Sequence, residues 1–144
     1  MSKVLVLGSN SFAGSCFVDY LLNKNIIVYG ISRSNERKNA KYKNNKNIKN
    51  FKFIKADINK DLNKYKNIIN KNKFKFIIDF LGQGMVAESW DNPQHWIKTN
   101  IVSKMKLINF LLNKKFLKKY LRISTPEVYG SSNVKMKENK SYNP

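Results

Sequence analysis

The sequence predicts a doubly wound α/β fold, in which a parallel sheet carries helices on both faces. Short apolar runs alternate along the chain with segments whose apolar residues recur at helical spacing. The first apolar run ends in a glycine-containing turn, residues 8–14, that leads directly into a helical segment. With 144 residues, 42% of them hydrophobic, the chain predicts one domain over residues 1–144 with a buried core.

The first half of the chain predicts three strands and one helix. Residues 4–7 form a continuous apolar run bounded by a polar turn, which is typical of a strand buried on both faces. Apolar residues between 17 and 22 then recur at helical spacing. Residues 26–31 and 51–56 are the second and third predicted strands. Residues 33–50 are rich in Lys and Asn and nearly free of apolar residues, which predicts a solvated loop or a poorly formed helix.

The second half predicts two more helices and two more strands. Residues 62–69 are helical by pattern, and residues 74–81 are the most strand-like run in the chain. A helix is expected over residues 93–112, and residues 120–124 form the fifth strand. Residues 131–144 show no hydrophobic period. The apolar residues of the long helix lie roughly on one side: Trp96, Ile101, Met105, Ile108 and Leu112.

The chain is strongly basic, with 28 Lys and Arg against 9 Asp and Glu and a formal net charge of +19. Such a balance suggests an anionic partner. However, Arg33, Arg37 and Arg122 are the only arginines, and the lysines are interleaved with asparagines throughout. This Lys/Asn pattern follows from base composition without any binding surface. A nucleic-acid surface at residues 33–50 stays an alternative, although that segment lacks dense arginines and interleaved aromatic residues.

Cysteine and histidine usage excludes several kinds of site. Cys16 is the single cysteine, so we expect no disulfide, no cysteine-based metal site and a cytoplasmic location. His95 is the single histidine and has no metal or nucleophile partner nearby in sequence, so we assign it a surface or packing role and predict no metal site. Trp90 and Trp96 are expected to be core or interface aromatics. No apolar run approaches the length of a membrane helix, so no membrane partner is expected.

The turn over residues 8–14 predicts a dinucleotide site because it joins a strand to a helix. Gly8 allows the tight turn, and Gly14 lets the helix pack close to the strand. Backbone N–H groups at the start of the helix would hold a pyrophosphate. Ser11 stands where a middle glycine is common, and Phe12 and Ala13 complete the candidate loop. A strand-to-helix turn without a ligand is the alternative.

The end of the second strand favours NADP over NAD. An acidic residue there binds the ribose 2′-hydroxyl of NAD, whereas an arginine accommodates the 2′-phosphate of NADP. Here Ser32 and Arg33 follow the strand, and residues 30–34 contain no carboxylate. We therefore predict NADP as the preferred cofactor, with NAD as the alternative.

Five segments follow the first turn and the ends of the later strands in a characteristic order. They are Gly8 to Gly14, Ala56-Asp57-Ile58, Phe80-Leu81-Gly82-Gln83, Thr99-Asn100 and Ser124 to Gly130. Together they resemble the extended short-chain dehydrogenase/reductases, specifically the NAD(P)-dependent sugar-nucleotide epimerase/dehydratase family. The resemblance covers residues 3–144, and Ser-Thr-x-Glu-Val-Tyr-Gly is its most specific motif. It implies a Rossmann-like fold and a nucleotide-sugar substrate.

The resemblance implies a role for each matching cofactor residue. Asp57 matches the aspartate that hydrogen-bonds the adenine amino group, and Ile58 matches the neighbour that packs on the ring. Leu81 and Gly82 match the strand end whose backbone runs past the cofactor ribose. Asn100 matches the helix asparagine that supports the site.

Two residues match the catalytic positions. Thr125 matches the hydroxyl residue that binds the sugar hydroxyl being oxidised. Glu127 matches the base of an Asp-Glu pair in the related dTDP-glucose 4,6-dehydratases. Pro126 stands where that pair has its acid and cannot donate a proton, so epimerisation or simple keto-sugar formation is favoured over full dehydration.

The resemblance also implies a catalytic Tyr-x-x-x-Lys pair, which should follow residues 138–144. The chain contains two matches, Tyr20 with Lys24 and Tyr42 with Lys46, where roughly one is expected by chance. They lie in the first helix and the basic loop, where neither is expected to reach a nicotinamide. The resemblance thus implies that the chain is an incomplete domain without the C-terminal substrate region of the family and is inactive alone. It also implies that the complete protein is a homodimer. A non-catalytic dinucleotide-binding module is the other alternative.

Overall fold

The computed structural model of the chain describes residues 3–144 and confirms the doubly wound α/β fold. Five parallel strands form one sheet in the order β3-β2-β1-β4-β5. The strands are β1 (Lys3–Leu7), β2 (Ile27–Ser32), β3 (Phe51–Lys55), β4 (Phe76–Asp79) and β5 (Lys119–Arg122). The helices are α1 (Phe12–Asn23), α2 (Leu62–Asn72), α3 (Val86–Asp91), α4 (Pro93–Ile97) and α5 (Ser103–Leu112).

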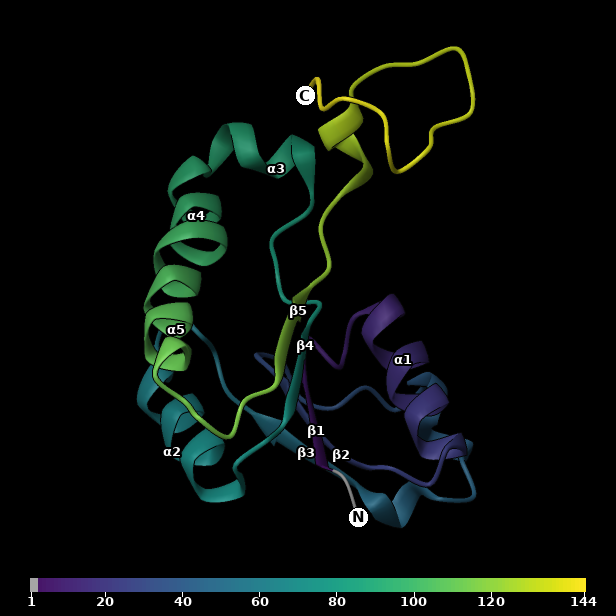
Figure 1. Cartoon of the computed structure of the whole chain (residues 1–144), viewed down its shortest axis with the longest axis vertical. Coiled ribbons are helices and arrows are strands. Elements are labelled where there is room, and N and C mark those ends of the chain that lie inside the picture. The colour runs from purple at the N-terminus through teal and green to yellow at the C-terminus, as the bar shows by residue number, and fades with distance from the viewer. Residues whose placement is uncertain (1–2) are drawn as a thin grey trace.

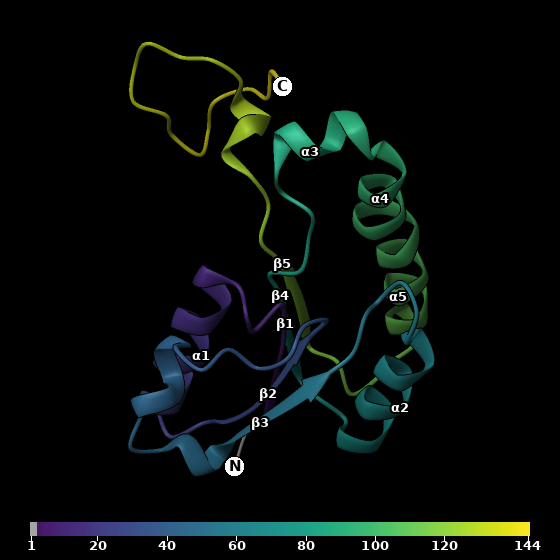
Figure 2. The same cartoon turned by 180° about the vertical axis from the view of Figure 1, so that it is seen from behind.

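Helices cover both faces of the sheet (Figures 1 and 2): α1 lies on one face, and α2 and α5 lie on the other. The central strand β1 explains this arrangement because its side chains alternate between two cores. Val4 and Val6 belong to the core that includes Val18 of α1. Leu5 and Leu7 belong to the core built with α2 and α5. Every β1 residue from 4 to 7 is at most 6% exposed, as the continuous apolar run predicts.

The predicted helix over residues 93–112 is three helical segments in succession. A π-helical turn, Lys98–Val102, joins α4 to α5. The residues that face the sheet are Thr99, Ser103, Leu107 and Leu111, spaced four apart. The apolar side noted in the sequence faces outward instead, with Ile101, Met105 and Leu112 59%, 53% and 75% exposed.

The segment between β2 and β3 corrects one prediction. Residues 33–50 are not simply a solvated loop, because Tyr42 is fully buried within the core beside α1. Its ring lies 4.3 Å from the ring of Phe51, centroid to centroid. Two 3₁₀ turns, Lys41–Asn44 and Ile48–Asn50, carry the chain over this face. A single aromatic residue in a polar segment has no period, so the pattern did not reveal it.

The two tryptophans lie in different environments. Trp90 of α3 is 83% exposed and does not belong to the core of this chain, whereas Trp96 of α4 is half-buried. Residues 131–144 contain neither helix nor strand and loop beyond the 3₁₀ turn Pro126–Tyr129 (Figure 1). Within residues 3–144, no helix has the length and apolarity needed to cross a bilayer. The same residues contain no cluster of three or more His, Cys, Asp or Glu suited to a metal ion.

Candidate functional site

The candidate site lies at the carboxyl ends of the strands, where the direction of strand order changes. β1 is flanked by β2 on one side and by β4 on the other. The connections from β1 to β2 and from β3 to β4 therefore leave a crevice above β1, which is where doubly wound sheets bind ligands. The turn over residues 8–14 lies at this point.

Backbone geometry of the turn requires glycine at two positions. Gly8 has a φ of +76°, and a Cβ there would lie 2.8 Å from the carbonyl carbon of Phe80. A Cβ on Gly14 would lie 2.3 Å from the Gly8 carbonyl oxygen. Ser11 is the N-cap of α1, and its Oγ accepts a hydrogen bond from the Gly14 N–H at 3.0 Å. The turn thus aims the start of α1 at the crevice.

A hydrogen-bond network fixes the loop after β2. The Asn10 N–H donates to Ser32 Oγ at 2.9 Å, and Asn10 Nδ2 donates to Ser34 Oγ at 3.0 Å and to the Asn35 carbonyl oxygen at 2.7 Å. Asn10 is only 6% exposed. The loop that carries Arg33 is therefore tied to the glycine turn.

Asp57 and Ile58 follow β3 at the same end of the sheet. Asp57 Oδ1 accepts the Asn59 N–H at 2.9 Å, which closes a tight turn after the strand. Asn59 Nδ2 donates to Thr99 Oγ1 at 2.8 Å, and Asn59 Oδ1 accepts from Ser103 Oγ at 2.7 Å. These bonds connect the turn after β3 to the helical segment that ends in α5.

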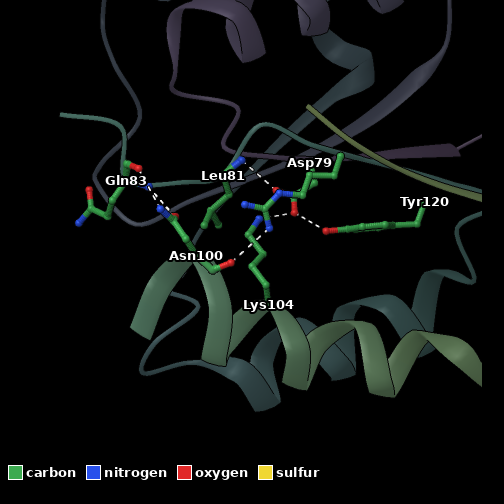
Figure 3. Close-up of polar contacts among 7 residues, drawn as sticks. Asp79, Leu81, Gln83, Asn100, Lys104 and Tyr120 are labelled. Atoms are coloured by element: carbon green, nitrogen blue, oxygen red, sulfur yellow. Dashed lines mark hydrogen bonds and ion pairs between the residues drawn. The ribbon is translucent and has the colours of Figure 1, made fainter. Parts of the chain in front are cut away.

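A loop of residues 80–84, which we call the crevice loop, follows β4 and is held at both ends (Figure 3). Asp79 Oδ1 accepts the Leu81 N–H at 2.8 Å. The Asn100 side chain accepts the Gln83 N–H at 2.9 Å and donates to the Gln83 carbonyl oxygen at 3.0 Å. The crevice loop is thereby fixed beside the glycine turn.

Two adjoining pockets meet at this loop and share five lining residues: Ser11, Phe80, Leu81, Gly82 and Gln83. The first has a volume of about 420 Å³ and lies toward β2 and β3. The second, of about 520 Å³, lies toward β5. The predicted residues that line the first pocket are Gly8, Ser11, Ser32, Arg33, Asp57, Ile58, Leu81 and Gly82. Those that line the second are Ser11, Phe12, Ala13, Leu81, Gly82, Asn100 and Thr125.

Two predicted site residues line neither pocket. Gly14 is buried behind the turn, where it sets the packing of α1 against β1. Glu127 is exposed in the 3₁₀ turn Pro126–Tyr129, beyond Thr125.

Sequence reasoning did not single out several residues that build the pockets. Arg37 and Asn59 line the first pocket, as does Asn10, whose side chain also holds the loop after β2. Arg37 had a signal in the sequence, since it is one of only three arginines and follows Arg33 by four residues. Asn10 lies within the predicted glycine turn, whereas Asn59 had no signal because asparagine is common throughout the chain.

A buried ion pair lies beneath the crevice loop. Lys104 Nζ of α5 and Tyr120 Oη of β5 both donate to Asp79 Oδ2. The side chains of Lys104 and Asp79 are 2% and 0% exposed. Burial lowers the pKa of Lys104, and the Asp79 carboxylate opposes this shift. Burial, followed by the charge of Asp79, raises the pKa of the Tyr120 phenol.

The sheet order, the glycine turn at the switch point and the crevice beside it define a Rossmann-like, dinucleotide-binding class of α/β domain. Residues 5–144 match the family model described as GDP-mannose 4,6 dehydratase. The chain belongs to this family of sugar-nucleotide epimerases and dehydratases, as the resemblance predicted.

Individual relatives are similar over most of the chain. It is 27% identical over 138 residues to a probable dTDP-glucose 4,6-dehydratase of Sinorhizobium fredii, covering 90% of this chain and 39% of that protein. It is 31% identical over 140 residues to UDP-glucose 4-epimerase of Pisum sativum, covering 89% of this chain and 38% of that protein. Among solved structures, the UDP-Glc/GlcNAc 4-epimerase of Campylobacter jejuni superposes with a TM-score of 0.84 at 25% identity, over 100% of this chain and 44% of that one. The chain therefore spans about two fifths of the length of these curated relatives.

Proposed function

We propose that this chain is the cofactor-binding domain, residues 1–144, of an NAD(P)-dependent sugar-nucleotide epimerase or dehydratase. In that reaction a sugar hydroxyl loses its proton to a base, and the carbon that bears it passes a hydride to the nicotinamide, which later returns it. The observation that carries the proposal is the pair of adjoining pockets, which are lined by residues from Asp57 through the start of α1 to Thr125. Family membership supports the same assignment.

Each part of the cofactor has a matching group along these pockets. The start of α1 suits the pyrophosphate, since Ser11, Phe12 and Ala13 line the second pocket and the positive end of a helix dipole favours an anion. Asp57 and Ile58 line the pocket toward β3, where they suit adenine. Leu81, Gly82 and Asn100 lie where the second ribose would rest, and Thr125 lies at the far end, where it suits the sugar hydroxyl.

We expect the chain alone to bind cofactor without turning over substrate. Tyr42 is fully buried beside α1, and Tyr20 lies on α1, so neither lines a pocket. Neither Tyr-x-x-x-Lys match in the chain is therefore suited to act as the base. Glu127 is a candidate acid or base only if it turns toward Thr125, and Pro126 disfavours full dehydration.

The affinities of the chain for NADP and NAD test the proposed function directly. We expect NADP to bind about tenfold more tightly than NAD. Arg33 and Arg37 both line the pocket next to Ser32, where a 2′-phosphate would lie. Arg33→Ala should weaken NADP about tenfold or more and leave NAD within about twofold, since a charge-assisted hydrogen bond contributes about 1.5–3 kcal/mol. Isothermal titration of both nucleotides measures this.

Lys38→Ala is the matched control, because Lys38 is an exposed cation of the same loop that lines neither pocket. Removing it should change neither affinity. Equal affinity of the wild-type chain for both nucleotides, with no effect of Arg33→Ala, would contradict the NADP assignment. Failure of both nucleotides to bind would contradict the proposed function itself.

The expected cytoplasmic location stays a prediction.

We also propose that the complete protein is a homodimer that pairs through the outer side of α4 and α5. Ile97, Ile101 and Met105 are each more than half exposed on this side. If the chain itself dimerises, Met105→Glu should shift it to monomers in sedimentation velocity, and Asn109→Glu, an exposed control on α5, should not. A wild-type chain that dimerises and stays dimeric with Met105→Glu would contradict the assignment of this side.

A further inference from the structure

The buried charges beneath the crevice loop bring three elements to one carboxylate. Asp79 is the last residue of β4, Lys104 lies on α5 and Tyr120 lies on β5. Figure 3 shows the Lys104 and Tyr120 side chains converging on Asp79 from opposite sides. Because both donors bind Oδ2, they fix the rotation of the Asp79 side chain.

The second oxygen of the same carboxylate acts outside this cluster. Asp79 Oδ1 accepts the Leu81 N–H at 2.8 Å, and Leu81 and Gly82 line both pockets. The Phe80 N–H donates to the Leu7 carbonyl oxygen at 2.9 Å, so β4 continues its ladder to β1 for one more residue. The chain leaves the sheet at Leu81, and the Asp79 carboxylate decides its direction there.

Stability alone does not account for an ion pair at this depth. Replacing a buried pair by apolar residues of similar volume is often neutral or stabilising, because desolvation of two charges offsets their attraction. An apolar cluster would fill the same space between α5, β4 and β5. What it could not supply is an acceptor for the Leu81 N–H, which would then lose its hydrogen bond.

We infer that Asp79, Lys104 and Tyr120 together position the crevice loop. Lys104 and Tyr120 orient the Asp79 carboxylate, and its Oδ1 then holds the backbone of Leu81 and Gly82 against the bound nucleotide. None of the three is a catalytic residue in this assignment. The inference rests on the proposed function for the identity of the ligand, but the loop geometry it describes exists without one.

The other end of the loop supports a positioning role. Asn100 holds Gln83 through two hydrogen bonds to its backbone, so residues 81 and 83 are both fixed. Gly82, between them, is exposed and free to approach a ligand. Loss of the Asp79 anchor would leave the loop held at one end only, and we expect the ligand-facing backbone to become mobile.

Two double variants separate positioning from stability. Asp79→Asn with Lys104→Met removes both charges but keeps a side-chain oxygen for the Leu81 N–H. Asp79→Leu with Lys104→Met removes the charges and the acceptor. Each full-length variant is measured for hydrogen exchange at the Leu81 amide without ligand, for NADP and NAD affinity, and for thermal stability.

The positioning role predicts different results for the two variants. In the Asn/Met variant, the Leu81 amide should stay protected, and cofactor affinity should stay within about threefold of wild type. In the Leu/Met variant, that amide should exchange as fast as the amide of exposed Gly84, and affinity should fall about tenfold or more at similar thermal stability. Such a split would support the inference even if both variants melt below the wild-type chain.

Several outcomes would overturn it. If cofactor affinity falls in proportion to thermal stability in both variants, the cluster has a structural role only. The same conclusion follows if both variants bind the cofactor with wild-type affinity. If the Leu/Met variant does not fold, exchange in the wild-type chain decides: a Leu81 amide protected at least about 100-fold relative to Gly84 supports the inference, and equal exchange overturns it. A wild-type chain that binds neither nucleotide would overturn the proposed function, while Leu81 exchange would still test the loop anchor.

Discussion

Replacing Gly14 with alanine should lower the free energy of unfolding by about 1–3 kcal/mol and weaken dinucleotide binding by about 30-fold or more. The added Cβ would lie 2.3 Å from the Gly8 carbonyl oxygen and 2.7 Å from Ser11 Oγ. The first of these atoms belongs to the backbone and the second caps α1, so neither can move without opening the turn. Urea unfolding and isothermal titration measure the two effects.

Gly84→Ala is the matched control for this prediction. No atom lies within 4 Å of a Cβ placed on Gly84, which is exposed in the crevice loop. The control should unfold within about 0.5 kcal/mol of wild type, as exposed substitutions usually do. A Gly14→Ala chain as stable as the control, with unchanged nucleotide affinity, would contradict the close packing of α1 on the turn and the placement of the pyrophosphate there.

Lys104→Met alone should be the most destabilising single substitution considered, by about 3–5 kcal/mol. It leaves the fully buried Asp79 carboxylate without its cation, and only the Tyr120 hydroxyl and the Leu81 N–H remain as donors. Adding Asp79→Asn removes the unpaired charge and should restore most of the loss. Equilibrium urea unfolding of the single and double variants measures the coupling between the two positions.

Lys106→Met controls for the loss of a lysine from α5, because Lys106 is exposed on the same helix. It should change the free energy of unfolding by less than about 0.5 kcal/mol. Two results would show that Asp79 and Lys104 are not an energetically coupled pair. One is a Lys104→Met chain with the same free energy of unfolding as this control, and the other is a double variant with Asp79→Asn that is less stable than Lys104→Met alone. Either result would also remove the basis for assigning the cluster a positioning role.

Local pattern was sufficient for most of the fold. The apolar run at residues 4–7 forms a strand buried on both faces, and the glycine turn leads into α1. The local sequence pattern did not predict the burial of single residues whose surroundings come from distant parts of the chain. Tyr42 packs on Phe51 from within a polar segment, and Trp90 is exposed although aromatic. Neither fact has a period in the sequence.

The sequence likewise predicted some residues of the candidate site and not others. Except for Gly14 and Glu127, the residues assigned from the turn and from the strand ends line the pockets, because parallel strands present their carboxyl ends at one edge of a sheet. The buried residues that orient the loops around the pockets could not be identified from the sequence. Lys104 is 25 positions from Asp79 and Tyr120 is 41, and nothing near either residue indicates the pairing.

The sequence by itself determined the five strands along the chain, the glycine turn and the family, because these depend on periodicities and motifs that span a few residues each. The tertiary structure alone decided which charges are buried together, which side of α5 faces the sheet and which backbone amides the buried carboxylate holds. These depend on distances between elements far apart in the chain, and only packing brings such elements within reach of a hydrogen bond.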